Sequence, residues 1–306
     1  MAQSDSISSL VADVGGTNTR VALSAKGIIA EGTISRFRNA EFDSLESVLK
    51  EYLSTQDGSI VDAACVAVAG PVRDGRGCLT NRDWQMDEAS IGQATGAREV
   101  ALLNDLQAQG YALDHVTEKD LLELRTGPVA PAGAAKLVVN LGTGFNASPV
   151  FMTPAGPYVA TSESGHANMP TRDARDLRLC AFIEQKHGFA AIDDILSGRG
   201  VERVFAFLSH EAGEKQQKSS AEIIAGCADG SDPLAVEAVH YFIQLTAMVM
   251  GNLALVQLPF GGIYLVGGLS SAIAPFIDAA GFEAAFRDKG RFAGFMDDFG
   301  IYVVQD

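Results

Sequence analysis

The sequence has few cysteines, and none of them are paired in the way that holds a metal or makes a redox centre. The four are scattered and form no Cys-x-x-Cys motif: Cys65, Cys78, Cys180 and Cys227. We therefore expect neither a disulfide scaffold nor a zinc cluster, and we expect a reducing, cytoplasmic setting. The polar N-terminus MAQSDSISSL also lacks the basic and then apolar layout of a signal peptide.

Basic residues are scarce as well. The chain has 23 Lys and Arg against 38 Asp and Glu, which gives a formal net charge of −15. Nucleic acids and anionic membranes are bound by clustered Lys and Arg, so the composition predicts neither as a partner. An anionic substrate such as ATP would instead need local backbone donors or a metal ion.

A clean apolar run of membrane length is missing too. The most membrane-like stretch, LTAMVMGNLALVQLPF from Leu245 to Phe260, contains Asn252 and Gln257 and ends near Pro259. It falls short of the roughly 20 apolar residues that a membrane-spanning helix needs. We expect it to be a buried core helix of a protein without a membrane span.

What the sequence does contain is the pattern of a two-domain α/β protein. It has 306 residues, of which 47% are hydrophobic and 20% charged, and about 150 residues make a typical domain. Short apolar runs alternate with segments of helical spacing, which favours an α/β sheet protein. We expect strands at 10–14, 19–23, 63–68, 100–103, 137–140, 147–152 and 262–266, and helices at 44–53, from 106, and at 173–186, 201–211, 232–250 and 281–286.

Two glycine-rich turns interrupt apolar strands in the same way. VADVGGTNTRVAL and VVNLGTGFNASPV both read as strand, glycine-rich turn and strand. Glycine lets the backbone approach an anion closely and point successive N–H groups at it. We expect one such hairpin in each domain, the two facing a nucleotide across a cleft.

The known kinds of phosphate loop differ in what surrounds their glycines. A Walker A motif is absent, and residues 142–147 match the dinucleotide fingerprint only formally, because Ser148-Pro149 opposes the helix that must follow. A third kind places an acid just before the turn, so that Asp13 would hold a hydrated Mg²⁺ and the turn would contact the β and γ phosphates. For this motif alone, a plain hairpin with a turn-favouring Asp is the alternative.

Several ordered motifs together resemble one family. DVGGTNTR at 13–20 resembles the first phosphate motif of the bacterial glucokinases, in the sugar kinase/actin ATPase superfamily. The similarity continues over nearly the whole chain, in LTNRDW (79–84), LLNDLQA (102–108), GTG (142–144), SESGHANMP (162–170), ILSGRG (195–200), FGGIYLVGG (260–268) and GFEAAFRDKGRF (281–292). Ordered landmarks of this kind are far more specific than any single motif.

The resemblance implies a fold and an activity. It implies a two-domain, actin-like (ribonuclease H-like) α/β ATPase fold with a deep interdomain cleft, and ATP-dependent phosphorylation of glucose to glucose 6-phosphate with Mg²⁺. Residues 1–110 would form the smaller domain, with the first hairpin and the catalytic carboxylate. Residues 111–306 would form the larger domain, with the second turn and the sugar and adenosine sites.

The resemblance also implies a role for individual residues. Asp105 would be the catalytic base, although before LQAQ it reads equally well as a helix N-cap, as does Asn104. The sugar would be bound by Asn104, Glu163, His166, Asp193 and Asn81. The phosphates would be bound by Gly15, Gly16, Thr17, Asn18, Gly142, Thr143 and Gly144, the adenosine by Gly267 and Gly268, and Mg²⁺ by Asp13 through water.

The sequence departs from the family pattern at several of these places. Ser162 and Ser164 replace glycines that flank the sugar-binding Glu, and Asn146 replaces the last glycine of the second turn. Asn would be the least costly replacement if that position had a positive φ. Asp193 stands where a Glu is usual, with Asp194 as a competing register, and the sequence stops at IYVVQD where the family continues into a further turn and helix. Either such a tail is missing from this sequence or the first domain's apolar face is covered differently.

These departures leave other functions open. Ser164 and Asp193 are compatible with a kinase for another hexose or an amino sugar. A non-catalytic, sugar-responsive regulator would need a DNA-binding element, and no basic helix-turn-helix precedes Leu10. A dehydrogenase rests only on the fingerprint match at 142–147. We expect a homodimer, the commonest assembly of soluble enzymes.

Overall fold

The computed structural model describes residues 8–56, 61–79 and 82–305 of the chain. It divides into two compact units, residues 1–108 (unit 1) and residues 109–306 (unit 2). Each unit is built around its own six-stranded sheet and its own hydrophobic core.

The sheet of unit 1 has the order β3-β2-β1-β5-β9, with β4 also paired to β2. Its strands are β1 (Ser8–Val14), β2 (Asn18–Ala25), β3 (Ile28–Ile29), β4 (Ser35–Arg38), β5 (Ala63–Val68) and β9 (Glu99–Asn104). The central strands β1, β5 and β9 are parallel, and their carboxyl ends meet in one row formed by Val14, Val68 and Asn104. β2 runs antiparallel to β1, so residues 15–17 form the turn of a hairpin at that same edge.

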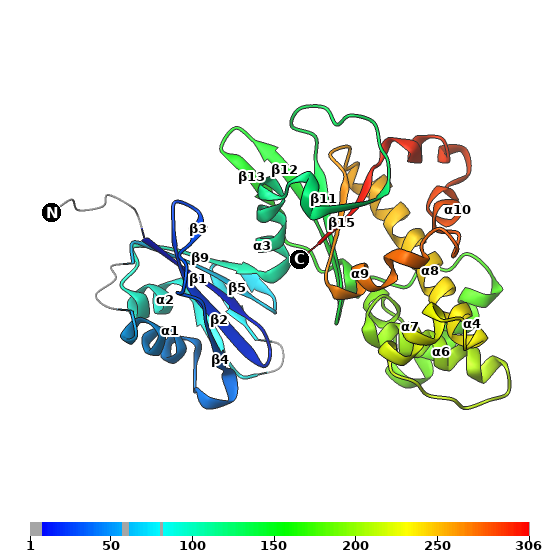
Figure 1. Cartoon of the computed structure of the whole chain (residues 1–306), viewed down its shortest axis with the longest axis horizontal. Helices are drawn as coiled ribbons and strands as arrows, with labels where there is room; N and C mark the ends of the chain where they lie inside the picture. The colour runs from blue at the N-terminus through cyan, green and yellow to red at the C-terminus, as the bar shows by residue number, and fades with distance from the viewer. Residues whose placement is uncertain (1–7, 57–60, 80–81, 306) are drawn as a thin grey trace. The chain divides into compact units, whose positions relative to one another are not determined.

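Two helices cover one face of the unit 1 sheet (Figure 1). α1 (Leu45–Ser54) begins with a capping box between Ser44 and Ser47, and α2 (Glu88–Thr95) with one between Asp87 and Ser90. Such boxes satisfy backbone N–H groups that the first helical turn leaves without partners. A three-stranded sheet of β6 (Val72–Arg73), β7 (Arg76–Cys78) and β8 (Gln85–Asp87) precedes α2, and α3 (Asp105–Ala112) follows β9 directly.

The sheet of unit 2 has the order β10-β15-β14-β11-β12-β13. Its strands are β10 (Leu121–Arg125), β11 (Lys136–Leu141), β12 (Phe145–Thr153), β13 (Gly156–Val159), β14 (Ile263–Val266) and β15 (Ile301–Val304). Its helices are α4 (Ala174–His187), α5 (Ile192–Ile195), α6 (Gly198–Glu211), α7 (Ser220–Ala228), α8 (Pro233–Gln257), α9 (Gly268–Ile273) and α10 (Phe282–Arg287). β11 and β12 form the second hairpin, with residues 142–144 as its turn.

The predicted core helix is α8, and the prediction of burial is confirmed. Asp232 caps its N-terminus by accepting from Leu234 N and Ala235 N, and Pro233 occupies its first turn. It packs against α6, α7 and α10 (Figure 1). Among the helices that the structure describes, α8 is the one long and apolar enough to cross a membrane, yet 61% of its most apolar stretch is buried within the protein.

The predicted strands and helices are found close to their expected positions, and the structure decides one alternative. A dinucleotide fingerprint requires a helix after its glycines, whereas residues 142–144 are followed by the strand β12. The dehydrogenase hypothesis for this turn is therefore wrong. Both glycine-rich segments are strand-turn-strand hairpins, as the sequence predicts.

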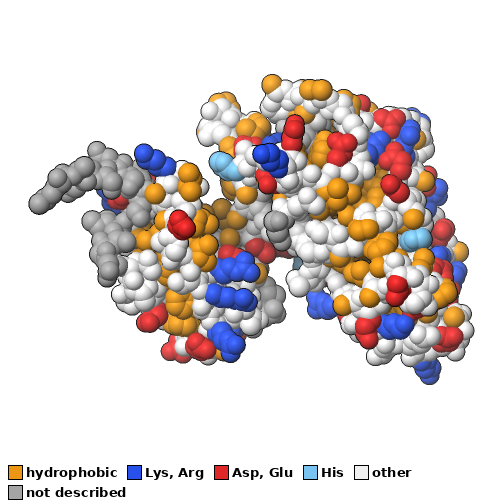
Figure 2. Space-filling view, viewed as in Figure 1, with side chains coloured by type: hydrophobic (Ala, Val, Ile, Leu, Met, Phe, Trp, Pro, Cys, Tyr) orange, Lys and Arg blue, Asp and Glu red, His pale blue; other side chains and the backbone are white. Residues whose placement is uncertain are grey.

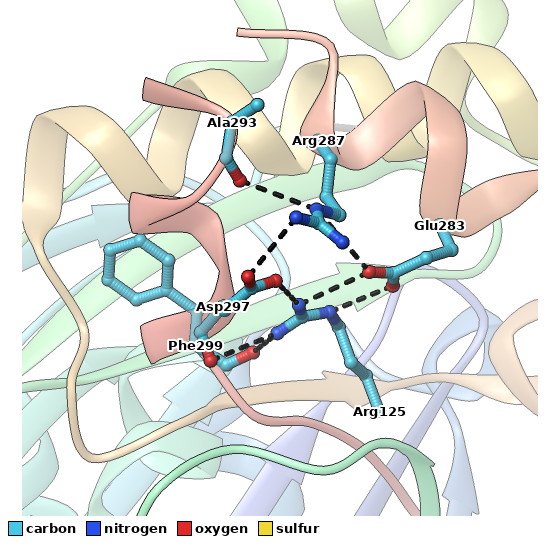
Figure 3. Close-up of polar contacts among 6 residues, drawn as sticks. All are labelled: Arg125, Glu283, Arg287, Ala293, Asp297 and Phe299. Carbon is cyan, nitrogen blue, oxygen red and sulfur yellow. Dashed lines mark hydrogen bonds and ion pairs between the residues drawn. The ribbon is translucent and has the colours of Figure 1, made fainter. Parts of the chain in front are cut away.

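A buried arginine holds the outer end of the unit 2 sheet together (Figure 3). Arg125, at the end of β10, donates from Nε and Nη2 to both carboxylate oxygens of Glu283, at 2.8 and 3.2 Å. The same guanidinium donates to Asp297 Oδ1 at 2.8 Å and to the carbonyl of Phe299 at 2.6 Å. Its side chain is only 9% exposed, whereas that of the neighbouring Arg287 is 40% exposed. Arg125 thereby joins segments more than 150 residues apart.

We expect Arg125→Met to lower the free energy of unfolding by about 2 kcal/mol or more, because it leaves two carboxylates and a carbonyl without their donor. Arg287→Met, at the more exposed arginine of the same cluster, should cost less than about 1 kcal/mol. Urea unfolding of the two variants measures the difference. Equal losses would contradict the assignment of Arg125 as the central donor.

Candidate active site

The first hairpin and the end of β9 bring predicted site residues together in unit 1. β1, β5 and β9 lie side by side, and Asp13 belongs to the penultimate row of that sheet, with Ala67 and Leu103. Asp105 begins α3 immediately after β9. The carboxyl edge of a sheet built from parallel strands is where α/β proteins bind their ligands. Asn81 lies outside the described residues.

Asp105 and Asp13 lie close enough for one charge to act on the other. Burial, together with the negative charge of Asp13, raises the pKa of Asp105, and a hydrogen bond from Leu106 N at 2.8 Å lowers it in part. Asp105 is half-buried, while Asp13 is exposed. An upward pKa shift is typical of a carboxylate placed to accept a proton. The exposed Asp13 carboxylate can be reached by a hydrated cation.

The side-chain amide of Asn104 makes hydrogen bonds to the protein backbone. Its Oδ1 accepts from Leu106 N at 3.0 Å, and its Nδ2 donates to the carbonyl of Gly70 at 3.0 Å. The helix-capping alternative therefore describes contacts that Asn104 makes. The Asn104 side chain also hydrogen-bonds to the Asp105 carboxylate and so lowers its pKa in part. Oδ1 keeps a second lone pair, so capping and binding of a sugar hydroxyl are compatible.

The turn of the first hairpin exposes donors. Gly15 N donates to Asn18 O at 3.0 Å, whereas the N–H groups of Gly16 and Thr17 donate to no backbone acceptor in the described part of the chain. Thr17 is exposed and its two preceding glycines are half-buried. Unspent N–H groups on a glycine turn are the donors that a phosphate needs.

Arginines that the sequence analysis missed lie beside this turn. Asp13 pairs with Arg20 across β1 and β2, and Arg20 pairs with Arg36 across β2 and β4, so their side chains share one face of the sheet. Arg38 lies on the same face, and all three arginines are exposed. Figure 2 shows Lys and Arg side chains gathered on the surface of unit 1. The three arginines give an acidic protein a local positive potential near the hairpin. The hairpin register, counted outward from the turn in the sequence, would have predicted the pairing of Asp13 with Arg20. It would not have predicted Arg36, which belongs to the separate strand β4.

Unit 2 places its second turn against a helix N-terminus. Gly142 O accepts from Gly198 N at 2.8 Å, at the start of the 14-residue helix α6. The dipole of such a helix favours negative charge at its N-terminal end. Thr143, at the tip of the turn, is exposed.

Gly267 and Gly268 lie next to the second turn, because β11 and β14 are parallel and Asn140 is in register with Val266. Gly267 has a φ of +96°, and a Cβ there would lie 2.7 Å from Asn140 Oδ1 and from Leu141 O. Both the conformation and the space therefore require glycine. Both glycines are exposed, so their backbone can approach a ligand beside the turn.

The two neighbouring aspartates, Asp193 and Asp194, make different contacts. Asp193 Oδ1 accepts from Phe145 N at 2.6 Å, directly after the second turn. Asp194 instead accepts from Ala191 N and pairs with Arg203 at 3.0 Å. Asp193 is therefore the aspartate that faces the turn, and one of its oxygens holds the turn's backbone.

Glu163 and His166 lie together on an exposed loop. Their side chains are 56% and 74% exposed, and His166 Nε2 lies 4.0 Å from Glu163 Oε2. A short 3-10 helix, residues 164–166, links them. Paired acceptor and imidazole groups of this kind suit sugar hydroxyls, which both donate and accept.

Three departures from the family pattern form one hydrogen-bonded network. Asn146 Nδ2 donates to Ser162 O at 2.6 Å, and Asn146 Oδ1 accepts from both Ser164 N and Ser164 Oγ at 3.0 Å. Ser164 Oγ in turn accepts from Ala147 N at 2.9 Å. The φ of Asn146 is not positive, so tolerance of the left-handed region does not explain this residue. Its side chain ties the second turn to the loop that carries Glu163.

The chain is similar to known proteins over nearly its whole length. A family model described as Glucokinase matches residues 10–306. A glucokinase of Marinobacter nauticus is 30% identical over 299 residues, which is 97% of this chain and 93% of that protein. The crystal structure of a glucokinase from an Antarctic psychrotroph has a TM-score of 0.85 and 25% identity, covering 98% of this chain and 95% of the other.

A more distant structure carries ligands. A ROK family glucokinase from Streptomyces griseus, solved in complex with glucose and AMPPNP, has a TM-score of 0.58 at 17% identity and covers 95% of this chain and 97% of its own. At that identity the likeness concerns the fold alone. Together the solved structures confirm the predicted actin-like α/β fold.

We expect Asn146→Ala to lower the free energy of unfolding by about 1–3 kcal/mol, since it leaves Ser162 O without its donor and removes the acceptor shared by Ser164 N and Ser164 Oγ. Hydrogen exchange at the Ser164 amide should quicken. Thr161→Ala, at an exposed residue of the same loop, should cost less than about 0.5 kcal/mol. Unchanged exchange at Ser164 in Asn146→Ala would contradict the network.

Proposed function

We propose a catalytic mechanism from the premise that this chain belongs to the glucokinase family. The reaction is the phosphorylation of glucose, with ATP as the donor used in this family. The family match favours glucose over another hexose or an amino sugar, and an enzyme over a non-catalytic regulator. The observation that carries the mechanism is the half-buried Asp105 beside Asp13 at the carboxyl edge of the unit 1 sheet.

In this mechanism Asp105 accepts the proton of the glucose 6-hydroxyl. The hydroxyl oxygen forms a bond to the γ-phosphorus of ATP, the bond from that phosphorus to the β,γ-bridging oxygen breaks, and ADP leaves. Phosphoryl transfer needs mostly positioning and electrostatic stabilisation. The turns at Gly15–Thr17 and Gly142–Gly144 would supply both to the phosphates, through the N–H groups of Gly16, Thr17, Thr143 and Gly144 and together with Asn18, while the N–H groups of Gly15 and Gly142 close the two turns.

The sugar and the adenosine are assigned to the remaining groups. We assign glucose to Asn104, Glu163, His166 and Asp193. Support comes from the exposed Glu163 and His166 pair and from the second lone pair of Asn104 Oδ1. Adenosine is assigned to Gly267 and Gly268, whose exposed backbone lies beside the second turn.

The residues around Asp13 fit a magnesium ion that arrives with ATP. Kinase Mg²⁺ is held by one or two carboxylates, water and substrate phosphates rather than by an all-protein cage. Asp13 is an exposed carboxylate, and the described residues contain no group of three or more His, Cys, Asp and Glu that could hold a metal. When bound, the ion would neutralise charge on the transferring phosphates.

The assembly and location of the protein are also proposals. A homodimer would follow the commonest pattern of soluble enzymes. The four cysteines are free, as in proteins of the reducing cytoplasm, and we place the enzyme there.

We expect Asp105→Asn to lower kcat by about 10²–10⁴-fold in an ADP-release assay with ATP and glucose, while glucose binding is largely kept. Asp74→Asn, at an 86% exposed carboxylate of the same unit, should leave turnover unchanged. The pKa of Asp105 is raised in the folded protein, so its ionised form lowers the free energy of unfolding. This cost disappears as the pH drops below that pKa. Asp105→Asn should therefore melt no lower than the wild type at pH 7. Full turnover by Asp105→Asn would rule out this base.

The pH profile tests the pairing of Asp105 with Asp13. The acid limb of kcat/KM should lie above the ordinary carboxyl range, because burial and the Asp13 charge raise the pKa of Asp105. Asp13→Asn removes that charge, so the limb should move to lower pH whatever the loss of rate. A limb that stays in place would show that Asp13 does not act on the titrating group.

A further inference from the structure

We infer that Asn39 is a positioning residue for the nucleotide: it holds the first hairpin turn so that the turn's N–H groups point outward. The inference rests on the proposed function, which assigns residues 15–17 to the phosphates of ATP. Asn39 is part of none of the motifs that carry the family resemblance. It lies more than 20 residues beyond the turn, directly after β4.

Asn39 is fully buried and spends its polar groups on the hairpin. Its Nδ2 donates to Gly15 O at 2.7 Å, and its backbone N donates to Thr17 O at 2.9 Å. Its Oδ1 accepts from Thr19 Oγ1 at 2.8 Å, and both side chains are 0% exposed. Asn39 is thus hydrogen-bonded to Gly15 and Thr17 of the turn and to Thr19 of β2, the strand that follows the turn.

The direction of the Gly15 carbonyl fixes the direction of the next N–H group. Gly15 C=O and Gly16 N–H belong to one planar trans peptide, in which the two groups point to opposite sides. Since the carbonyl points inward at Asn39, the Gly16 N–H points away from the core. That N–H has no backbone acceptor within the described part of the chain, and so it is available to an anion.

The Gly15 carbonyl sets the orientation of the Asn39 amide. Because a carbonyl can only accept, Nδ2 must face Gly15, and Oδ1 then faces Thr19 and accepts from its hydroxyl. The hydroxyl and the amide therefore act as a pair, and the loss of either loosens the turn. An Asp at position 39 would have the same shape but would set an acceptor oxygen against the Gly15 carbonyl.

Asn39→Asp is the sharpest variant, because it removes the donor and keeps the volume. We expect it to raise both the KM for ATP and the Kd for AMPPNP by about tenfold or more, with a lower kcat and a KM for glucose within about twofold of the wild type. Thr19→Val, which removes only the hydroxyl that donates to the buried Asn39 Oδ1, should raise the same two constants by about threefold.

Tyr52→Phe is the matched control for simple destabilisation of unit 1. Tyr52 is fully buried in the core of unit 1 and donates to Thr33 O at 2.8 Å, and its hydroxyl makes no hydrogen bond to the turn at residues 15–17. It should melt at a lower temperature than the wild type while its KM for ATP and Kd for AMPPNP stay within about twofold. Calorimetric titration with AMPPNP, steady-state kinetics and thermal melting are measured on all four proteins.

The possible results separate a positioning role from a merely structural one. A folded Asn39→Asp with unchanged Kd for AMPPNP and KM for ATP overturns the inference, as does a Tyr52→Phe that loses nucleotide affinity equally. If Asn39→Asp does not fold, the comparison of Thr19→Val with Tyr52→Phe tests the inference by the same two constants. A wild type that binds AMPPNP but does not phosphorylate glucose overturns the proposed function alone, and one that does not bind AMPPNP overturns both.

Discussion

A backbone turn presents its N–H groups to a phosphate in a fixed direction when carbonyls of the turn are hydrogen-bonded on the other side. Each hairpin of this chain has such a contact. In unit 1 the carbonyls of Gly15 and Thr17 accept from Asn39. In unit 2 Gly142 O accepts from the first residue of α6. The surrounding sheets serve to bring these partners to the carboxyl edge, where the turns lie.

The same edge of unit 1 holds two carboxylates near each other, which is unfavourable without a cation. Burial, and to a smaller extent the charge of Asp13, raise the pKa of Asp105, so the protein gives up some stability to keep a proton acceptor in place. In unit 2 the residues that depart from the family pattern at positions 146, 162 and 164 belong to one hydrogen-bonded network. Asn146 is bonded to Ser162 and Ser164, so the loop that carries Glu163 is held by side chains that glycines would not supply.

Most of the regular structure could be predicted from the sequence, because central strands and amphipathic helices show their burial in local patterns. AACVAV is buried at alternate positions in β5, and Asp232-Pro233 indicates the start of α8. The edge strand β4, with sequence SRFR, has no such signal, since only Phe37 packs toward the core. The roles of Asn39 and Arg125 were missed for the same reason, because each depends on contacts with residues that are distant in the sequence. The roles given to the site residues remain predictions.

The position of β15 in its sheet has a consequence for how the polypeptide matures. β15 lies between β10 and β14, so residues 301–304 separate two strands that would otherwise be left with open edges. During synthesis the strands of unit 1 are all available once residue 104 has left the ribosome, whereas the sheet of unit 2 stays divided until residue 304 has emerged. Nascent chains therefore pass through a stage with unpaired strand edges, and a variant without residues 301–304 would keep those edges unpaired and prone to aggregation.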